Sequence, residues 1–326
     1  MSIATLSTYS QMRDILNAPL ADRPRLLEEM LQPVAGMYRY FPGDADLVAL
    51  HHMGSGFRVD RDDERAQAGL EALREANAWS RIDGALNDAL AVQLEATPDI
   101  AVPDLQVVIV LGDPADEHFM DVNLGMAAAA GMPGYLWFNF WPSVENLMRL
   151  EAVAVHELNH NLRYSNVVWD PATVTVGEQV VSEGLADAFA RQLYGDLGYT
   201  RIGVPSLGDD AVFDKVVAGL GVTGMQNFPA YVHGDATALR FGGTPVGLPT
   251  GAGYAVGNRL MDAYLAATAS PASVAGGATY ETGGSDNNPS DAARRGQSAA
   301  DALLVEASEV IRIGTERLPF PGQRRG

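Results

Sequence analysis

The sequence predicts an α+β protein that is mostly helical and carries a small mixed sheet. Apolar residues recur at three- and four-residue spacing through most of the chain, as they do on the buried face of an amphipathic helix. Two short runs, 105–112 ("LQVVIVLG") and 134–142 ("GYLWFNFWP"), instead have the β-branched or aromatic composition of buried strands. Helical patterns resume after the second run, which predicts a helical C-terminal lobe.

Composition excludes several classes of protein. The chain has 326 residues, of which 47% are hydrophobic and 19% charged, as in an ordinary globular protein with room for a large core. No run reaches the roughly 18 apolar residues that a membrane-spanning helix needs. The N-terminus, "MSIATLSTYSQMRDILNAPL", lacks the pattern of a secretory signal, so we expect a cytoplasmic protein.

Charge and cysteine usage narrow the possible partners and cofactors. A net charge of −19 repels phosphate backbones and anionic lipids, so we expect neither nucleic acid nor a membrane surface as a partner. The chain contains no cysteine, which leaves His, Asp and Glu as its strong metal ligands. The oligomeric state does not follow from the sequence.

Composition divides the chain into four segments. Residues 1–97 form an N-terminal helical region, and residues 98–269 hold both predicted strands and the motif described below. Residues 270–297 are poor in large apolar side chains, which predicts a flexible loop or insertion. Residues 298–326 begin with a helix opened by Ser298 and Asp301 and end in a disordered tail. The pair His51 and His52 falls between predicted helices of the first segment and is expected to be a surface feature rather than a metal site.

Capping signals locate the helices of the central segment. Ser143 is a candidate N-cap for one helix through "VENLMRLEAVAVHELNHNLRYS". Thr175 and Glu178 have the spacing of a capping box, and Gly195 is a candidate stop for the helix that they open. The stretch 200–250 is irregular and rich in glycine and proline, and helical spacing returns at 253–269.

The first of these helices carries a metal-binding motif. His156 and His160 are four residues apart, so on a helix both imidazoles lie on one face and can reach one ion at about 2.0–2.1 Å. Glu157 follows the first histidine, as in the HExxH arrangement, and is placed to accept a proton from water at the metal. The metzincin pattern HExxHxxGxxH does not continue, because Arg163 and Asn166 stand where it requires glycine and histidine.

The third ligand is therefore expected on another segment. The next predicted helix contains "SEGLAD", in which Glu183 lies 23 residues after His160. Catalytic zinc has three protein ligands as a rule, and a glutamate as the third is the gluzincin arrangement. Asp187, one turn after Glu183, is suited to hold a ligating histidine through its free N–H.

These motifs carry a resemblance to a known family. "HELNHNLR", "VVSEGLADAFARQLYG" and "GYAVGNRLMDAYL", together with the sequence between about 105 and 269, resemble a bacterial domain-of-unknown-function family of predicted zinc-dependent proteases. The resemblance implies a gluzincin-type metallopeptidase in which 98–269 form a zincin-like core. It also implies Zn²⁺ as cofactor and a peptide or protein as substrate.

Under this hypothesis, zinc is held by His156, His160 and Glu183, and Glu157 is the general base. A further donor would polarise the oxyanion, and Tyr254 and His233 are the candidates for it. By analogy with zincins, the substrate would pair with an edge strand, for which 134–141 is the natural choice.

The side chains around this assignment have further interpretations. Trp137 and Phe138 alternate faces, so we expect one of them to belong to the core. For Arg163 we favour an ion pair with the neighbouring helix over binding of a substrate terminus.

Two alternatives remain open from the sequence. In the first, His156 and His160 are core histidines paired with Glu157 and Glu183. In the second, the protein is a non-hydrolytic, metal-stabilised or metal-free protein that binds peptides or acts as a regulator through the same cleft. The presence of Glu157 favours the enzyme.

Overall fold

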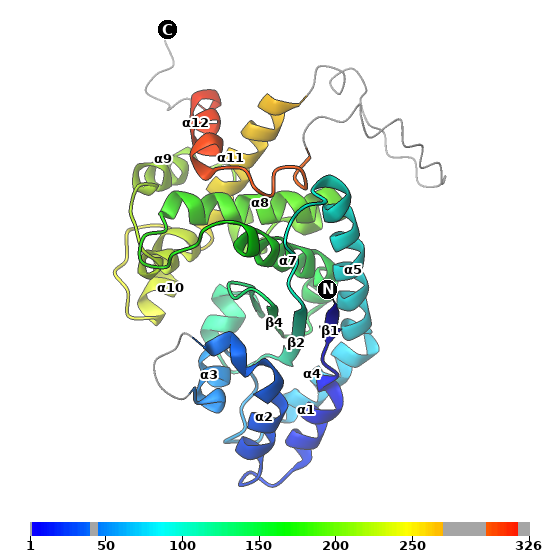
Figure 1. Ribbon diagram of the computed structural model, residues 1–326. Helices are drawn as coiled ribbons and strands as arrows, with labels where there is room; N and C mark the ends of the chain where they lie inside the picture. The colour runs from blue at the N-terminus through cyan, green and yellow to red at the C-terminus, as the bar shows by residue number, and fades with distance from the viewer. Residues whose placement is uncertain (1, 40–44, 270–297, 319–326) are drawn as a thin grey trace.

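The computed structural model describes residues 2–39, 45–269 and 298–318 (Figure 1). Within these residues the protein is mostly helical and contains one mixed four-stranded sheet, which confirms the predicted α+β class. The predicted loop 270–297 and the predicted tail after residue 318 lie outside the described residues.

The sheet has the strand order β1-β2-β4-β3. β1 (Ile3–Thr5), β2 (Leu105–Leu111) and β4 (Tyr135–Phe140) are parallel, and β3 (Met126–Ala129) pairs antiparallel with β4. The two predicted strands thus form the centre of the sheet. Their side chains are almost all buried because both faces of the sheet are covered, which is why the two runs are apolar throughout.

The prediction that 134–141 is an edge strand is wrong. β4 lies between β2 and β3, with Phe138 aligned to Ile109 on one side and to Ala128 on the other. The edge of the sheet next to β4 is therefore β3. Its sequence, "MAAA", has neither β-branched nor aromatic residues, so composition did not mark it as a strand.

The N-terminal region supplies both helices and a strand. Its helices are α1 (Thr8–Asn17), α2 (Arg23–Leu31), a 3-10 helix (Gln32–Tyr38), α3 (Leu47–Met53), α4 (Glu64–Glu75) and α5 (Ala78–Ala96). Helices α1 and α4 pack on β2, and α5 packs beside β1 and α7 (Figure 1). β1, which was not predicted, joins this region to the central sheet.

His51 and His52 lie in α3 and not in a surface loop, which corrects the prediction. His51 is 1% exposed, its ring lies edge-on to Phe57 with centroids 4.9 Å apart, and its Nε2 lies 2.9 Å from the Phe57 carbonyl oxygen. Burial lowers the pKa of His51 to about 3. His51 is thus a neutral core side chain.

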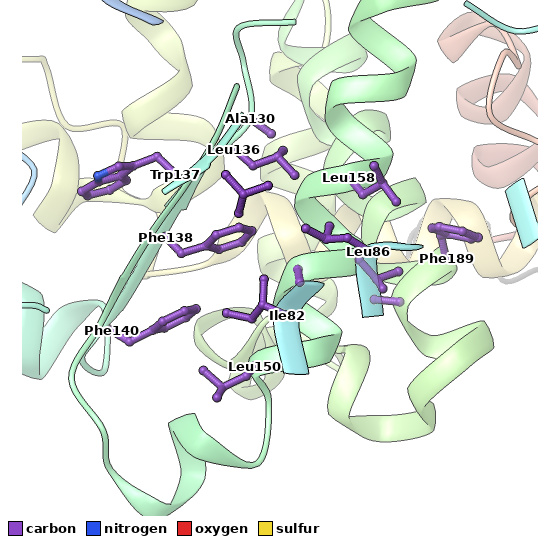
Figure 2. Close-up of a cluster of buried hydrophobic side chains, with 14 of the residues drawn as sticks. Ile82, Leu86, Ala130, Leu136, Trp137, Phe138, Phe140, Leu150, Leu158 and Phe189 are labelled. Carbon is purple, nitrogen blue, oxygen red and sulfur yellow. The ribbon is translucent and has the colours of Figure 1, made fainter. Parts of the chain in front are cut away.

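The core between the sheet and the helices is built from alternate residues of β4. Figure 2 shows Leu136, Phe138 and Phe140 directed toward α5 and toward Leu158 and Leu150, the latter at the start of α7, whereas Trp137 is directed to the other side. Phe138 is fully buried, as expected for one of the alternating pair, and Trp137 is also 92% buried because it packs on Gly54 beyond α3. Both therefore belong to the core.

The predicted helix over 143–165 is interrupted. Ser143 caps the short α6 (Val144–Leu147) by accepting a hydrogen bond from the backbone N–H of Asn146, and α7 (Leu150–Asn166) then begins separately. Asn146 is buried and its Nδ2 donates to the carbonyl oxygens of Leu124, Gly125 and Trp141, which ties α6 to the end of the sheet.

The next helix begins and ends as predicted. The Thr175 hydroxyl accepts from the Glu178 N–H at 3.0 Å at the start of α8 (Val176–Tyr194), and Gly195 ends the helix with a φ of 58°. A π-helical turn, His118–Val122, lies earlier in the chain, between β2 and β3. After α8 come two further helices, α9 (Asp210–Gly219) and α10 (Asp235–Arg240). The short 3-10 and π turns around them are Gly195–Gly198, Arg201–Ser206 and Met225–Asn227 (3-10) and Pro229–His233 (π).

The C-terminal lobe packs on α8. It consists of α11 (Ala252–Thr268), as predicted for 253–269, and α12 (Ala307–Arg317) (Figure 1). Ser298 hydrogen-bonds Asp301 at 2.7 Å, but the segment that they begin is a turn, and the helix starts later than predicted. Across the residues that the structure describes, no helix has the length and apolar character required to cross a membrane.

Candidate metal centre

Helices α7 and α8 bring the three predicted ligands together. The Nε2 atoms of His156 and His160 are 3.0 Å apart, and the Glu183 Oε2 lies 3.2 Å from the first and 3.1 Å from the second. All three side chains are at least 93% buried. Among the described residues, they are the group of histidines and carboxylates whose ligand atoms converge closely enough to hold a metal ion.

The geometry of these atoms fits zinc. In a tetrahedral site with ligands at about 2.0–2.1 Å, neighbouring ligand atoms lie about 3.3 Å apart. The three separations here, between 3.0 and 3.2 Å, are close to that value. These three atoms would therefore fit a zinc ion held at about 2 Å from each.

Asp187 fixes the orientation of His156. Its Oδ1 lies 2.9 Å from the His156 Nδ1 and accepts from the Thr200 hydroxyl at 2.7 Å, while its Oδ2 accepts from the Thr200 N–H at 3.0 Å and from the Asn258 Nδ2 at 2.6 Å. Asp187 is fully buried. With the proton on Nδ1, the lone pair of Nε2 is directed at the other two ligands.

His160 is positioned by a neighbour on its own helix. The Tyr164 ring, one turn later, stacks on the His160 ring with centroids 5.5 Å apart, and the Tyr164 hydroxyl lies 3.3 Å from His160 Nδ1. When Nδ1 carries the ring proton, the Tyr164 hydroxyl accepts a hydrogen bond from it, and the lone pair of Nε2 is again free to bind a cation.

Charges at the centre are strongly coupled. Burial lowers the pKa of His156, but hydrogen bonds to Asp187 and Glu183 outweigh burial and raise it well above its ordinary value. Burial also opposes the charged form of Glu183, yet the His160 charge and the hydrogen bonds from both histidines hold the pKa of Glu183 low. The three side chains therefore favour an ionised Glu183 with a positive charge beside it, and a bound cation can supply that charge.

Glu157 stands next to the ligands and faces the cleft. It is 7% exposed, and no hydrogen bond of the described residues engages its carboxylate. Burial raises the pKa of Glu157, although the histidine charges oppose the increase. A carboxylate with these properties is suited to accept a proton at neutral pH.

A close helix crossing explains the glycine of the "EGLAD" motif. A Cβ on Gly184 would lie 2.1 Å from the carbonyl oxygen of Gly257, so the two glycines allow the backbones of α8 and α11 to touch. This contact holds Asn258 of α11 against Asp187 of α8. The glycine between Glu183 and Asp187 is thus part of how the centre is assembled.

Two cavities meet at the centre. The smaller has a volume of about 130 Å³ and the larger about 930 Å³. Residues that line both are Ala128 of the edge strand β3, His156, Glu157, His233 and Tyr254. The cleft therefore passes along β3 and over the candidate metal ligands.

The two predicted oxyanion donors both reach this cleft. Tyr254 lies at the start of α11 with its ring centroid 6.3 Å from that of His156, and His233 lies 5.6 Å from the Tyr254 ring. Burial and the charges of Glu183 and Glu157 raise the pKa of Tyr254 well above its usual value, so its hydroxyl keeps its proton. Burial lowers the pKa of His233, which favours the neutral ring.

Arg163 has the structural position that we favoured. It is 1% exposed, pairs with Glu178 through Nε at 3.0 Å and Nη2 at 2.7 Å, and donates to the carbonyl oxygens of Leu303 and Val305. It joins α7, α8 and the segment before α12 and does not line either cavity.

Several residues of the site were missed from the sequence. Asn258 is four residues after Tyr254 and Arg149 is seven before His156, so helical spacing alone would have placed each on the same face as a known candidate. Thr200 and Arg201 lie at the start of a short 3-10 helix, within a stretch whose sequence has no periodicity to indicate which way a side chain points.

Comparison with known proteins is consistent with these observations. Residues 86–281, more than half of the chain, match the family model described as "Predicted Zn-dependent protease (DUF2268)". The "uncharacterized protein YjfC" of Bacillus subtilis (strain 168) is 30% identical over 230 residues, which cover 69% of this chain and 74% of that protein. No solved structure matches. The chain therefore belongs to the DUF2268 family of predicted zinc-dependent proteases.

Proposed function

We propose that the protein is a zinc-dependent peptidase with a gluzincin-type centre in a zincin-like core. The observation that carries this proposal is the convergence of His156, His160 and Glu183 within 3.2 Å of one another in a buried cleft that also contains Glu157. A pair of core histidines would not need a third partner, an orienting aspartate and an open cavity at the same point.

Zinc, when bound by His156, His160 and Glu183, supplies a Lewis acid that polarises the peptide carbonyl and makes water more acidic. Glu157 accepts a proton from the attacking water and then donates it to the leaving amine, for which its raised pKa suits it. Tyr254 lines the same cleft, and its hydroxyl donates a hydrogen bond to the developing oxyanion, with neutral His233 as the second candidate.

The edge strand β3 is the expected docking site for the substrate backbone. Its other side is paired with β4, and residues 126–130, which comprise β3 and the residue after it, line the two cavities in turn. A peptide that adds to this edge in an extended conformation passes beside Glu157.

The test begins with metal content. Elemental mass spectrometry of protein purified without added metal or chelator should find about one zinc per chain, and the double variant His156→Ala/His160→Ala should lose it. Glu157→Gln should keep the metal and lose peptide hydrolysis, because only the base is removed. Failure of the wild type to take up zinc, even when zinc is supplied, would refute the proposal. Zinc binding without any peptide cleavage would instead indicate a non-hydrolytic peptide-binding protein.

A further inference from the structure

Two arginine side chains line the smaller cavity beside the candidate centre. Arg149 immediately precedes α7, and Arg201 begins the 3-10 turn Arg201–Ser206. The rest of this cavity is formed mainly by apolar side chains and by Glu157, His156 and Tyr254. Both arginines are only partly exposed, so their charges act in a sheltered environment.

Neither guanidinium has an acidic partner among the described residues. The Arg149 Nη1 donates to the carbonyl oxygens of Leu197 at 2.8 Å and Tyr199 at 3.4 Å, and the Arg201 Nη1 donates to the Asn146 side chain at 2.6 Å. The Nε and Nη2 donors of both side chains make no hydrogen bond to a described residue and are not sealed from solvent.

Unpaired arginines are unexpected here. The chain has 41 acidic and 22 basic residues, and comparable half-buried arginines, such as Arg191 and Arg240, pair with Asp262 and Asp116. The Asp187 charge does act on Arg149, but both Asp187 oxygens are already bonded to other groups.

The two positive charges also disfavour each other. Burial lowers the pKa of Arg149, and the charge of Arg201 lowers it further. An anion bound between them would remove this repulsion and use the free donors, since a guanidinium matches a carboxylate in a two-bond arrangement.

Antiparallel pairing with the edge strand would give the substrate a defined direction. Met126 and Ala127 line only the smaller cavity, and Ala129 and Ala130 line only the larger one. A peptide that pairs antiparallel with β3 has its N-terminal side near Ala129 and its C-terminal side near Met126. Its residue on the carboxyl side of the cleaved bond then lies in the smaller cavity, whose volume of about 130 Å³ suits a group the size of one residue.

We propose that the smaller cavity is a carboxylate-recognition pocket, in which Arg149 and Arg201 bind a carboxylate of the residue that follows the cleaved bond. The carboxylate comes either from the C-terminus of the substrate, which makes the enzyme a carboxypeptidase, or from an Asp or Glu side chain. The direction of the substrate in this proposal rests on the proposed peptidase function.

Binding to an inactive protein tests the pocket independently of hydrolysis. We would titrate zinc-loaded, full-length Glu157→Gln protein calorimetrically with three N-acetylated peptides that differ only at the C-terminus: Ala with a free carboxylate, Ala amide and Glu amide. At least one of the two peptides with a carboxylate should bind at least about 10-fold more tightly than Ala amide, since a hydrogen bond to a charged group changes a binding constant by about that factor. Tight binding of the free acid alone would show that the pocket recognises the C-terminal carboxylate. Tight binding of Glu amide alone would show that it recognises an acidic side chain.

Variants of the two arginines provide the second part of the binding test. Arg149→Gln and Arg201→Gln, each combined with Glu157→Gln, should bind the preferred peptide about as weakly as Ala amide, while the exposed control Arg312→Gln should keep the preference. Because Arg149 also holds two backbone carbonyls, the melting temperature of each variant is measured, and Arg201→Gln provides an independent test should Arg149→Gln not fold.

Two outcomes would refute the proposed carboxylate-recognition pocket. The first is that all three peptides bind equally or that none binds. The second is that the folded arginine variants keep the preference for the carboxylate. The wild type with the preferred peptide is the separate test of hydrolysis. A preserved binding preference without cleavage would refute the peptidase and leave the pocket established.

Discussion

Replacement of Asp187 by Asn tests how the centre is held. The change keeps the shape of the side chain but places an NH₂ group at one of the two oxygen positions. At the Oδ2 position, the NH₂ would face two donors, the Thr200 N–H and the Asn258 amide. At the Oδ1 position, it would face the His156 Nδ1, which would have to give up its proton. In that tautomer Nε2 carries the proton and cannot bind metal.

The expected loss follows from these contacts. Either arrangement removes at least one hydrogen bond between a carboxylate and a buried donor, and one such bond contributes about 1.5–3 kcal/mol. Since about 1.4 kcal/mol corresponds to a tenfold change in a binding constant, zinc affinity should fall about 10- to 100-fold. Thr200→Val removes only one donor to Asp187 and keeps the N–H bond, so its effect should be smaller.

Competition with a chromophoric zinc chelator at pH 7.5 measures this change. The matched control is Asp262→Asn, which alters a half-exposed carboxylate that pairs with Arg191 on the surface. Circular dichroism and melting temperature establish that Asp187→Asn is folded. Wild-type zinc affinity in a folded Asp187→Asn protein would refute the argument that Asp187 orients His156.

Three further predictions concern the ligand set, the helix crossing and pH. Glu183→Ala should lower zinc affinity more than Asp187→Asn does, whereas the exposed control Glu145→Ala should not; full zinc retention would move the third ligand elsewhere. Gly184→Ala should destabilise the fold by at least about 1–3 kcal/mol in urea unfolding and weaken zinc binding, because its methyl group would overlap the Gly257 backbone; a stable variant with full zinc would contradict the crossing. The pKa of His51 is lowered to about 3 in the folded state, so its stabilising contribution is complete above about pH 6.5 and is lost as the pH falls toward 3. Between pH 7 and pH 5 this loss is about 2 kcal/mol and should be absent in His51→Gln; identical pH profiles of the two proteins would show that His51 does not remain neutral.

Local patterns in the sequence were sufficient for part of the fold. Helix starts at Ser143 and Thr175 were predictable because a capping side chain binds a backbone N–H only two or three residues away. The strand over 105–111 was predictable because a strand covered on both faces is apolar throughout. By contrast, the order of the strands depends on contacts between distant segments, and β1 and β3 are too short and too ordinary in composition to be recognised.

The same distinction applies to the candidate site. The spacing of His156, Glu157 and His160 was sufficient to place these side chains together, because all three lie on one regular helix. That Glu183 reaches the two histidines, and that Asp187 binds the first of them, depends on how α8 packs against α7.

The sequence by itself determined the residue types of the candidate ligands, the motif helix and the helical class of this protein, since each depends on residues close together in the chain. Only the tertiary structure decided that β3 is the edge strand and that Arg149 and Arg201 share a cavity with Glu157. These arrangements join segments separated by many residues. The free energy that selects them comes from the burial of side chains across the whole molecule, which no local pattern contains.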